Sequence, residues 1–226
     1  MKTKMVFFAV CMACAFLGKA QFSVGVKTGV NFADAKLSGI SDALLPNANI
    51  ISTPTAGINI QYRVTDQLSF QPEINYIQRG FQAKESFQFD VFNFPVPLGI
   101  KAITRINYLE LPVQLKYKFT TGNVQPYIMG GPSLSYAMNG TVREVANVLI
   151  DINIGTQNIN LSNSNFNRWE AGGRLAAGLA FKTVLGEIQL EGAYYHSMTD
   201  FFKNPIVDVH AYNKGFTLQA GWSYNF

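Results

Sequence analysis

Strict alternation of apolar and polar residues is the feature that most constrains the fold of this chain. In "FSVGVKTGVNF", residues 22–32, apolar side chains fall on one face of an extended strand, and polar or small residues fall on the other. The same period-two pattern recurs in eight segments: 22–32, 58–64, 68–76, 107–119, 124–136, 169–181, 188–194 and 216–226. Because these segments show no convincing helical periodicity, the sequence predicts an all-β fold.

The connections between these segments are alternately short and long. Short connections lie at 64–67, 120–123 and 182–186, and long ones at about 33–53, 80–105, 137–168 and 197–213. Tight turns at one end of the strands and long loops at the other are typical of up-and-down outer-membrane barrels, in which both termini lie on the periplasmic side. We therefore expect an eight-stranded antiparallel transmembrane β-barrel.

Charged residues within the predicted strands lie on the face opposite the apolar residues. They are Lys27, Arg63, Glu73, Arg79, Glu110, Lys116, Lys118, Glu170, Arg174, Glu187 and Glu191. A soluble barrel that carries a lipophile would turn its apolar face inward and its charges to water, whereas a membrane barrel turns its charges into the lumen. Alternation alone does not choose between these two arrangements.

Three features favour the membrane barrel. The long loops lie on one side only. The apolar face has aromatic residues at strand ends, as interfacial girdles do: Phe22, Phe32, Tyr62, Phe119, Trp169, Phe181 and Phe226. The charged face carries glycines, which suit a narrow interior: Gly25, Gly29, Gly57, Gly172, Gly178, Gly215 and Gly221. We therefore predict that lipid surrounds the barrel and that the eleven charges form a network in its lumen.

Four prolines interrupt the predicted strands. Because proline has no N–H to donate to a strand ladder, it is confined to edges, first positions and bulges. We expect β-bulges at these positions: Pro72, Pro112, Pro126 and Pro132.

The first twenty residues have the features of a secretory signal peptide. Lys2 and Lys4 precede an apolar stretch at 5–17, and Gly18-Lys19-Ala20 forms a small-x-small cleavage site. The alternative is a lipoprotein anchored through Cys11 or Cys14, whose preceding residues fit a lipid-attachment box poorly. The predicted organisation is a signal peptide at 1–20 and a barrel domain at 21–226.

Removal of the signal peptide changes what the composition implies. Three of the eighteen basic residues leave, so fifteen face fourteen acidic ones, and no cysteine remains. The basic isoelectric point therefore gives no reason to expect a nucleic-acid partner. We expect export to the outer membrane of a Gram-negative bacterium, with outer-membrane lipids and lipopolysaccharide around a monomeric barrel.

The last segment, "QAGWSYNF", combines alternation with a second pattern. Gln219, Gly221, Tyr224 and Phe226 occupy the places of the C-terminal signal that the barrel-assembly machinery reads in outer-membrane proteins. The other interpretation is that they are ordinary membrane-facing strand residues. Both can hold, because the signal is itself a strand, and closing a barrel requires the last strand to pair with the first.

Four stretches together resemble the PorT family of outer-membrane β-barrel proteins. They are "SFQPEINYIQRG", "NYLELPVQLKYKF", "PYIMGGPSLSY" and "GFTLQAGWSYNF", in the family's order and at similar spacing. The resemblance covers essentially the chain after residue 20. It implies the barrel fold, and because the founding member is associated with a secretion apparatus, it suggests an envelope complex as the setting.

The lumen charges allow two functional interpretations. Buried charges must be paired or solvated, so they form either a salt-bridged plug or the wall of a narrow path for ions or small solutes. A third, distant alternative is a lipid A-modifying enzyme that uses His196, Ser197 and Asp200 of "YYHSMTD". Glu187 and Glu191 make a carboxylate pair conceivable, with salt bridging as the competing use.

Neither metal ligands nor cofactor motifs stand out in the sequence, so we predict no enzyme, no metal and no cofactor. The segment 80–105 is unusually aromatic for a loop, with Phe81, Phe87, Phe89, Phe92 and Phe94. The segment 137–168, around "LIDINIGTQNINL", indicates a hairpin beyond the membrane. We expect these two loops to engage an envelope protein or glycan partner, and the barrel to act as a structural or interaction component.

Overall fold

The structure is a computed structural model that describes residues 21–38, 50–91, 94–147, 151–161, 167–199 and 210–226. The predicted signal peptide at 1–20, together with Phe92 and Asp200, lies outside these described residues. No helix among the described residues is long and apolar enough to cross a membrane.

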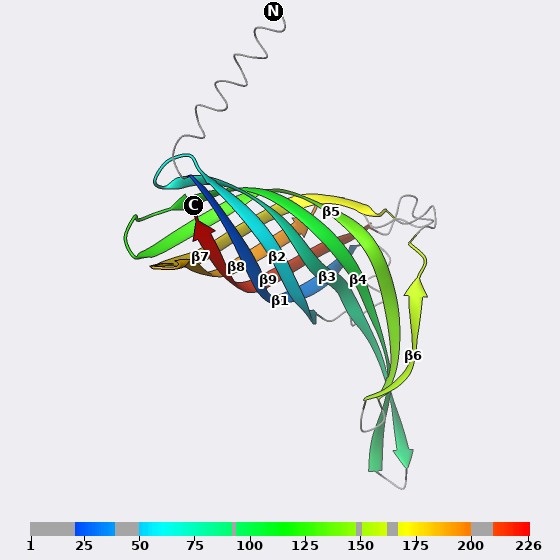
Figure 1. Cartoon of the computed structure of the whole chain (residues 1–226). Helices are drawn as coiled ribbons and strands as arrows, with labels where there is room; N and C mark the ends of the chain where they lie inside the picture. The colour runs from blue at the N-terminus through cyan, green and yellow to red at the C-terminus, as the bar shows by residue number, and fades with distance from the viewer. Residues whose placement is uncertain (1–20, 39–49, 92–93, 148–150, 162–166, 200–209) are drawn as a thin grey trace, which may run out of the picture.

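The described residues form nine antiparallel strands. Their bounds are β1 Phe22–Ser38, β2 Ile51–Arg63, β3 Leu68–Val91, β4 Phe94–Lys118, β5 Val124–Asn147, β6 Asp151–Ile159, β7 Trp169–Thr183, β8 Gly186–Ser197 and β9 His210–Asn225. Eight of them close into a barrel in the order β1-β2-β3-β4-β5-β7-β8-β9, with β9 paired to β1 (Figure 1). The predicted eight-stranded antiparallel barrel is therefore confirmed, and β6 is a ninth strand that pairs with β5 outside the ring.

The barrel is apolar outside and polar inside. Among the described buried residues, polar and charged side chains outnumber hydrophobic ones about two to one, whereas valines, leucines and isoleucines of every barrel strand are exposed. A soluble protein has the opposite distribution. Because a charged side chain facing lipid at mid-depth costs about 2–4 kcal/mol, and a one-residue slip exchanges the two faces, this inside-out pattern fixes the register of the strands.

The seam between the first and last strands closes the barrel. β1 and β9 pair without interruption from Ser23–Asn225 to Ser38–His210. The Phe226 amide donates to the Phe22 carbonyl over 3.1 Å. The short turns and the C-terminus lie at one end of the barrel (Figure 1), which the rule for outer-membrane barrels assigns to the periplasm.

The expectation of bulges at the four prolines was wrong. The register is the same on both sides of Pro72, Pro112 and Pro132, and the ladder simply omits residue pairs beside them. Around Pro126 the pairing with β7 is continuous. The missing N–H therefore removes local hydrogen bonds without inserting a residue. In the described strands, register shifts occur instead at Asn107/Tyr108 and Glu144/Val145.

Three barrel strands, β3, β4 and β5, continue beyond the barrel wall at the end opposite the short turns, and β6 joins them there. The β3–β4 hairpin pairs as far as Val91–Phe94, so much of the predicted loop 80–105 is strand. Beside it, β5 continues to Asn147 and pairs with β6 in the hairpin expected within 137–168. We call residues 80–91, 94–105, 141–147 and 151–158 the extension, which stands out from the barrel as a four-stranded sheet (Figure 1).

Candidate functional site

The lumen contains ten of the eleven charges that the sequence places on the inward face. Each of the ten is at most 5% exposed. Arg63 is half-buried and lies at the short-turn end, where β2 ends. The candidate site is therefore the barrel interior itself.

Arg79 organises the half of the lumen nearer the extension. Its guanidinium donates to Glu110 over 2.6 Å and to Glu170 over 3.1 Å. The guanidinium carbon lies 3.7 Å from the ring centre of Tyr195 and 5.1 Å from that of Tyr108. Two carboxylates and two aromatic rings therefore surround one arginine, which offsets part of the cost of taking its charge out of water.

Arg174 connects this cluster to the middle of the lumen. Its guanidinium nitrogens lie 3.4 Å from Glu110 and 3.6 Å from Glu191. Glu191 in turn accepts from Lys27 over 2.9 Å, and Lys27 also donates to Glu73 over 2.6 Å. Seven charges thus form one continuous chain of ion pairs: Glu170, Arg79, Glu110, Arg174, Glu191, Lys27 and Glu73.

A smaller group of charges occupies the short-turn end. Lys118 donates to Glu187, and the Lys116 ammonium lies 4.0 Å from Glu187 and 4.0 Å from the ring centre of Tyr127. With this group included, the ten buried charges comprise five basic and five acidic residues. A neutral total is what a low-dielectric interior requires.

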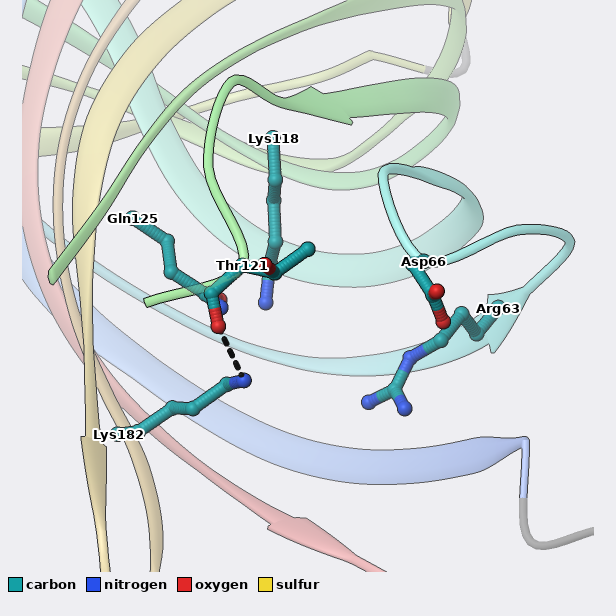
Figure 2. A pocket seen from close by; sticks show the side chains of 6 residues that line it. All are labelled: Arg63, Asp66, Lys118, Thr121, Gln125 and Lys182. Atoms are coloured by element: carbon teal, nitrogen blue, oxygen red, sulfur yellow. Dashed lines mark hydrogen bonds between the residues drawn. The ribbon is translucent and has the colours of Figure 1, made fainter. Parts of the chain in front are cut away.

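The lumen ends in a polar pocket at the short turns. It has a volume of about 280 Å³, and its lining residues come from β2, β4, β5, β7 and the adjacent turns: Arg63, Asp66, Lys118, Thr121, Gln125 and Lys182. The Lys182 ammonium donates to the Thr121 carbonyl over 2.9 Å, while the Arg63 guanidinium points into the open space (Figure 2). Arg63 is therefore a rim residue and no member of the buried ion-pair chain.

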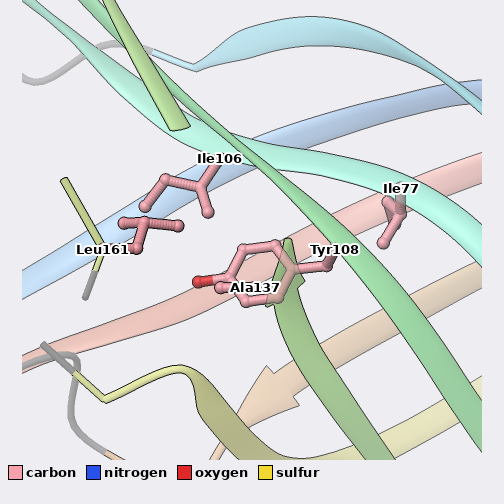
Figure 3. Packing of buried hydrophobic residues seen from close by; sticks show 5 residues of the cluster. All are labelled: Ile77, Ile106, Tyr108, Ala137 and Leu161. Carbon is pink, nitrogen blue, oxygen red and sulfur yellow. The ribbon is translucent and has the colours of Figure 1, made fainter. Parts of the chain in front are cut away.

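An apolar cluster occupies the opposite end, where β3, β4 and β5 leave the barrel. It consists of Ile77, Ile106, Tyr108, Ala137 and Leu161, with Ile159 of β6 packed against it (Figure 3). Tyr108 also takes part in the Arg79 cluster. This cluster was not predicted from the sequence. Its signal was present, since Ile106 and Tyr108 share the parity of Glu110 and therefore face inward.

The residues proposed for lipid A chemistry are not arranged as a nucleophile and base. His196 is exposed on the outer face of β8, whereas Ser197 is buried on the inner face. The Ser197 hydroxyl donates to the Thr199 carbonyl over 3.0 Å, and the His196 ring stacks on Tyr194. Successive strand residues point to opposite faces, so this neighbouring pair could not act together, and Asp200 lies outside the described residues.

Glu187 and Glu191 also have separate partners. Glu187 accepts from Lys118, and Glu191 pairs with Lys27 and Arg174. Salt bridging is therefore the use that the structure shows for both carboxylates. Among the described residues, no group of histidine, cysteine, aspartate or glutamate side chains could hold a metal ion.

The four residues of the predicted C-terminal signal divide between the two faces of β9. The Gln219 side chain accepts from Arg174 over 2.9 Å, and Gly221 packs closely against Lys27. Tyr224 and Phe226 are exposed on the outer face, with their rings 5.1 Å apart. Gln219 and Gly221 therefore face the lumen, and Tyr224 and Phe226 belong to the aromatic rim of the outer face.

Solved outer-membrane proteins resemble the chain along nearly their whole length. Neisserial surface protein A is 17% identical, covering 91% of this chain and 97% of its own, with a TM-score of 0.41. Ail of Yersinia pestis is 11% identical, covering 90% and 99%, with a TM-score of 0.42. OprG of Pseudomonas aeruginosa is 12% identical, covering 90% and 96%, also with a TM-score of 0.42. At these scores the likenesses carry no argument of their own.

The family comparison is decisive by contrast. No curated protein matches the sequence significantly. The profile of the family described as "Outer membrane protein beta-barrel domain" matches residues 18–203, a span that includes most of the barrel wall and the extension. This chain therefore belongs to the outer membrane protein β-barrel domain family and is an integral outer-membrane protein of a Gram-negative bacterium.

Proposed function

We propose that this protein is a PorT-like scaffold of the cell envelope, with a closed lumen and an extension that binds an envelope protein. The extension is the observation that carries the proposal. Three barrel strands continue past the wall and, together with β6, form a paired sheet, which is more structure than anchoring in a membrane requires. Functional residues are commonly presented on such projections from a rigid scaffold.

The edges of the extension suit the addition of a strand from a partner. Within the described residues, β6 pairs on one side only, with β5, and residues 78–91 of β3 pair only with β4. An unpaired edge presents backbone N–H and C=O groups that an extended segment can bind. Ile152 and Ile154 of β6 are exposed and supply apolar contacts beside that edge.

The ion-pair chain supports the closed lumen. An eight-stranded barrel has an interior just wide enough for side chains to fill. Here two buried arginines and their carboxylate partners occupy its middle. A solute would have to displace these ion pairs to pass, and a buried charge left without its partner costs about 3–5 kcal/mol.

A narrow channel is the alternative, and one observation favours it. Buried amide groups on the lumen side, including those of Asn59 and Gln114, have no hydrogen-bond partner in the described part of the protein. Buried polar atoms are normally satisfied by protein or by water, so water is needed beside these amides. A connected file of such water would conduct ions, whereas isolated molecules would not.

Crosslinking in intact outer membranes, followed by affinity purification of the full-length tagged barrel, tests the scaffold role. A variant in which a two-residue Asn-Gly turn replaces residues 82–103 shortens the β3–β4 hairpin but keeps the barrel ladders. The matched control replaces Val184 and Leu185, which are exposed in a turn at the opposite end, with serine. Folding of both is checked by heat-dependent gel mobility.

We expect the wild type and the turn control to capture the same defined envelope proteins, and the shortened variant to lose them. Recovery of the wild-type barrel alone would overturn the scaffold role. Undiminished capture by the folded, shortened variant would instead remove the β3–β4 hairpin as the binding surface and leave only the β6 edge.

A further inference from the structure

The pocket at the short-turn end of the lumen has a net positive charge, unlike the rest of the lumen. Arg63, Lys118 and Lys182 line it together with a single carboxylate, Asp66. Lys116 lies two residues before Lys118 on the inward face of β4, and Glu187 is the acidic partner of both lysines. Four basic and two acidic side chains therefore gather at this end, and the excess is positive.

The lining cations converge without full compensation from the protein. The charges of Arg63 and Lys182 both act repulsively on Lys118. Arg63 makes no side-chain hydrogen bond or ion pair with any described residue, and Lys182 donates to a neutral carbonyl only. Like charges brought together raise the free energy of the site, and a bound anion would lower it.

The donor set fits an oxyanion with several acceptor atoms. An arginine guanidinium offers a fork of donors that matches phosphate geometry, and lysine ammonium groups add point charges. Thr121 and Gln125 contribute neutral polar groups to the same pocket. In Figure 2 the Arg63, Lys118 and Lys182 side chains extend from three different sides toward one central space, whose volume of about 280 Å³ admits a phosphate group.

The surroundings of the pocket place it at the level of lipid headgroups. Val64, Phe119, Val124, Val184 and Leu185 are exposed apolar residues in or beside the short turns that form its rim. Apolar and aromatic side chains at the end of a barrel strand mark the membrane interface. Phosphate groups of inner-leaflet lipids therefore lie at the height of this pocket, as does free phosphate of the periplasm.

We propose that this pocket is a binding site for a phosphate group at the periplasmic mouth of the barrel. The group is carried either by an anionic phospholipid headgroup or by inorganic phosphate. The site is separate from the extension, so it does not depend on the scaffold role.

The test uses the full-length refolded barrel in two arms. In the first, inorganic phosphate is titrated into the protein in a nonionic detergent at constant ionic strength, and binding is followed by calorimetry. In the second, the barrel is released from vesicles of phosphatidylcholine containing phosphatidylglycerol, and retained lipid is identified by native mass spectrometry. Arg63→Gln and Lys182→Gln are the test variants, and Arg143→Gln, at an exposed position of the extension, is the control for loss of one positive charge.

We expect each test variant to weaken binding at least tenfold in one arm, and Arg143→Gln to stay within twofold of wild type. A loss confined to the first arm identifies inorganic phosphate as the ligand, and a loss in the second identifies the lipid headgroup. Absence of binding in both arms, or equal binding by wild type and folded Arg63→Gln, would overturn the proposal.

Discussion

Glu110 is the residue on which the lumen network depends most. It is fully buried, and it accepts from Arg79, Arg174 and Ser133. In Glu110→Gln both arginines lose a counter-charge but keep one each, Glu170 and Glu191. Because removing one partner of a buried ion pair costs about 3–5 kcal/mol, we expect the free energy of unfolding in urea to fall by about 3 kcal/mol.

Glu144→Gln is the matched control for this prediction. Glu144 lies half-buried on β5 in the extension, outside the barrel wall. Substitutions away from buried networks change stability by about 0.5 kcal/mol or less. If Glu110→Gln unfolds at the same urea concentration as wild type, the ion pairs do not stabilise the barrel.

At the residue scale, the face of each charge was predictable, but its partner was not. Alternation within each strand is a local property, so period-two parity was enough to place both Lys27 of β1 and Glu191 of β8 on the inward face. Their hydrogen bond joins residues 164 positions apart and depends on the stagger of eight strands around the barrel. The inward position of Tyr108 follows from the same parity, but Tyr108 was not predicted as a lumen residue, because only the charged and small residues of the inward face were considered.

At the scale of elements, the seam between β1 and β9 is closely packed at Gly29. A Cβ at Gly29 would overlap the Leu218 carbonyl oxygen of β9. Overpacking of this kind costs about 1–3 kcal/mol. We expect Gly29→Ala to lower the fraction that refolds in detergent, measured by heat-dependent gel mobility.

Gly173→Ala is the control for the seam. A Cβ at Gly173, on β7, would meet only the Met198 methyl group at 3.9 Å, an ordinary contact. We expect it to refold like wild type. Equal refolding of the two variants would show that β1 and β9 separate easily enough to accept a methyl group at the seam, which contradicts the prediction.

The end of β9 allows a second element-scale prediction, about the assembly signal. Phe226 is exposed on the outer face and contributes one backbone hydrogen bond to β1. Because Phe226→Ala keeps that bond, we expect little change in refolding in detergent but a severalfold lower yield in the outer membrane. Phe22→Ala, at the same rim on β1, is the control, and an equal loss of yield in both would indicate a general girdle effect.

Elements were predictable where alternation is regular and one face must meet lipid. The eight wall segments satisfy this condition, and all eight are strands. Alternation weakens in 80–105 because neither face of the extension is obliged to meet lipid. That segment was therefore interpreted as a loop, although backbone pairing with β4 continues through it.

For the whole molecule, the balance of ten buried charges determines how the lumen behaves. Five positive and five negative side chains cancel without bound ions. The neutral total was almost visible in the sequence, where six basic and five acidic residues share the inward face. Because Arg63 lies at the rim and not among the buried charges, the buried positive and negative charges are equal in number. Arg63 instead contributes to the positive excess at the periplasmic mouth.

A conductance measurement distinguishes the closed barrel from the channel. Because paired side chains fill the middle of the lumen, we expect wild-type barrels in planar bilayers to show no steady current above that of the bilayer. The double variant Glu110→Ala with Arg174→Ala removes one charge of each sign and the bulk of two fully buried side chains. Its lumen would admit water along a wider path, so we expect small, steady single-channel currents.

The matched control is the double variant Arg143→Ala with Glu144→Ala, a neutral pair of changes in the extension. We expect it to be as silent as wild type, since it leaves the lumen intact. Steady current through the wild type would establish the channel and contradict the closed lumen. Silence of the Glu110–Arg174 variant, once its folding is verified, would mean that the apolar cluster around Tyr108 closes the barrel even without the central ion pair.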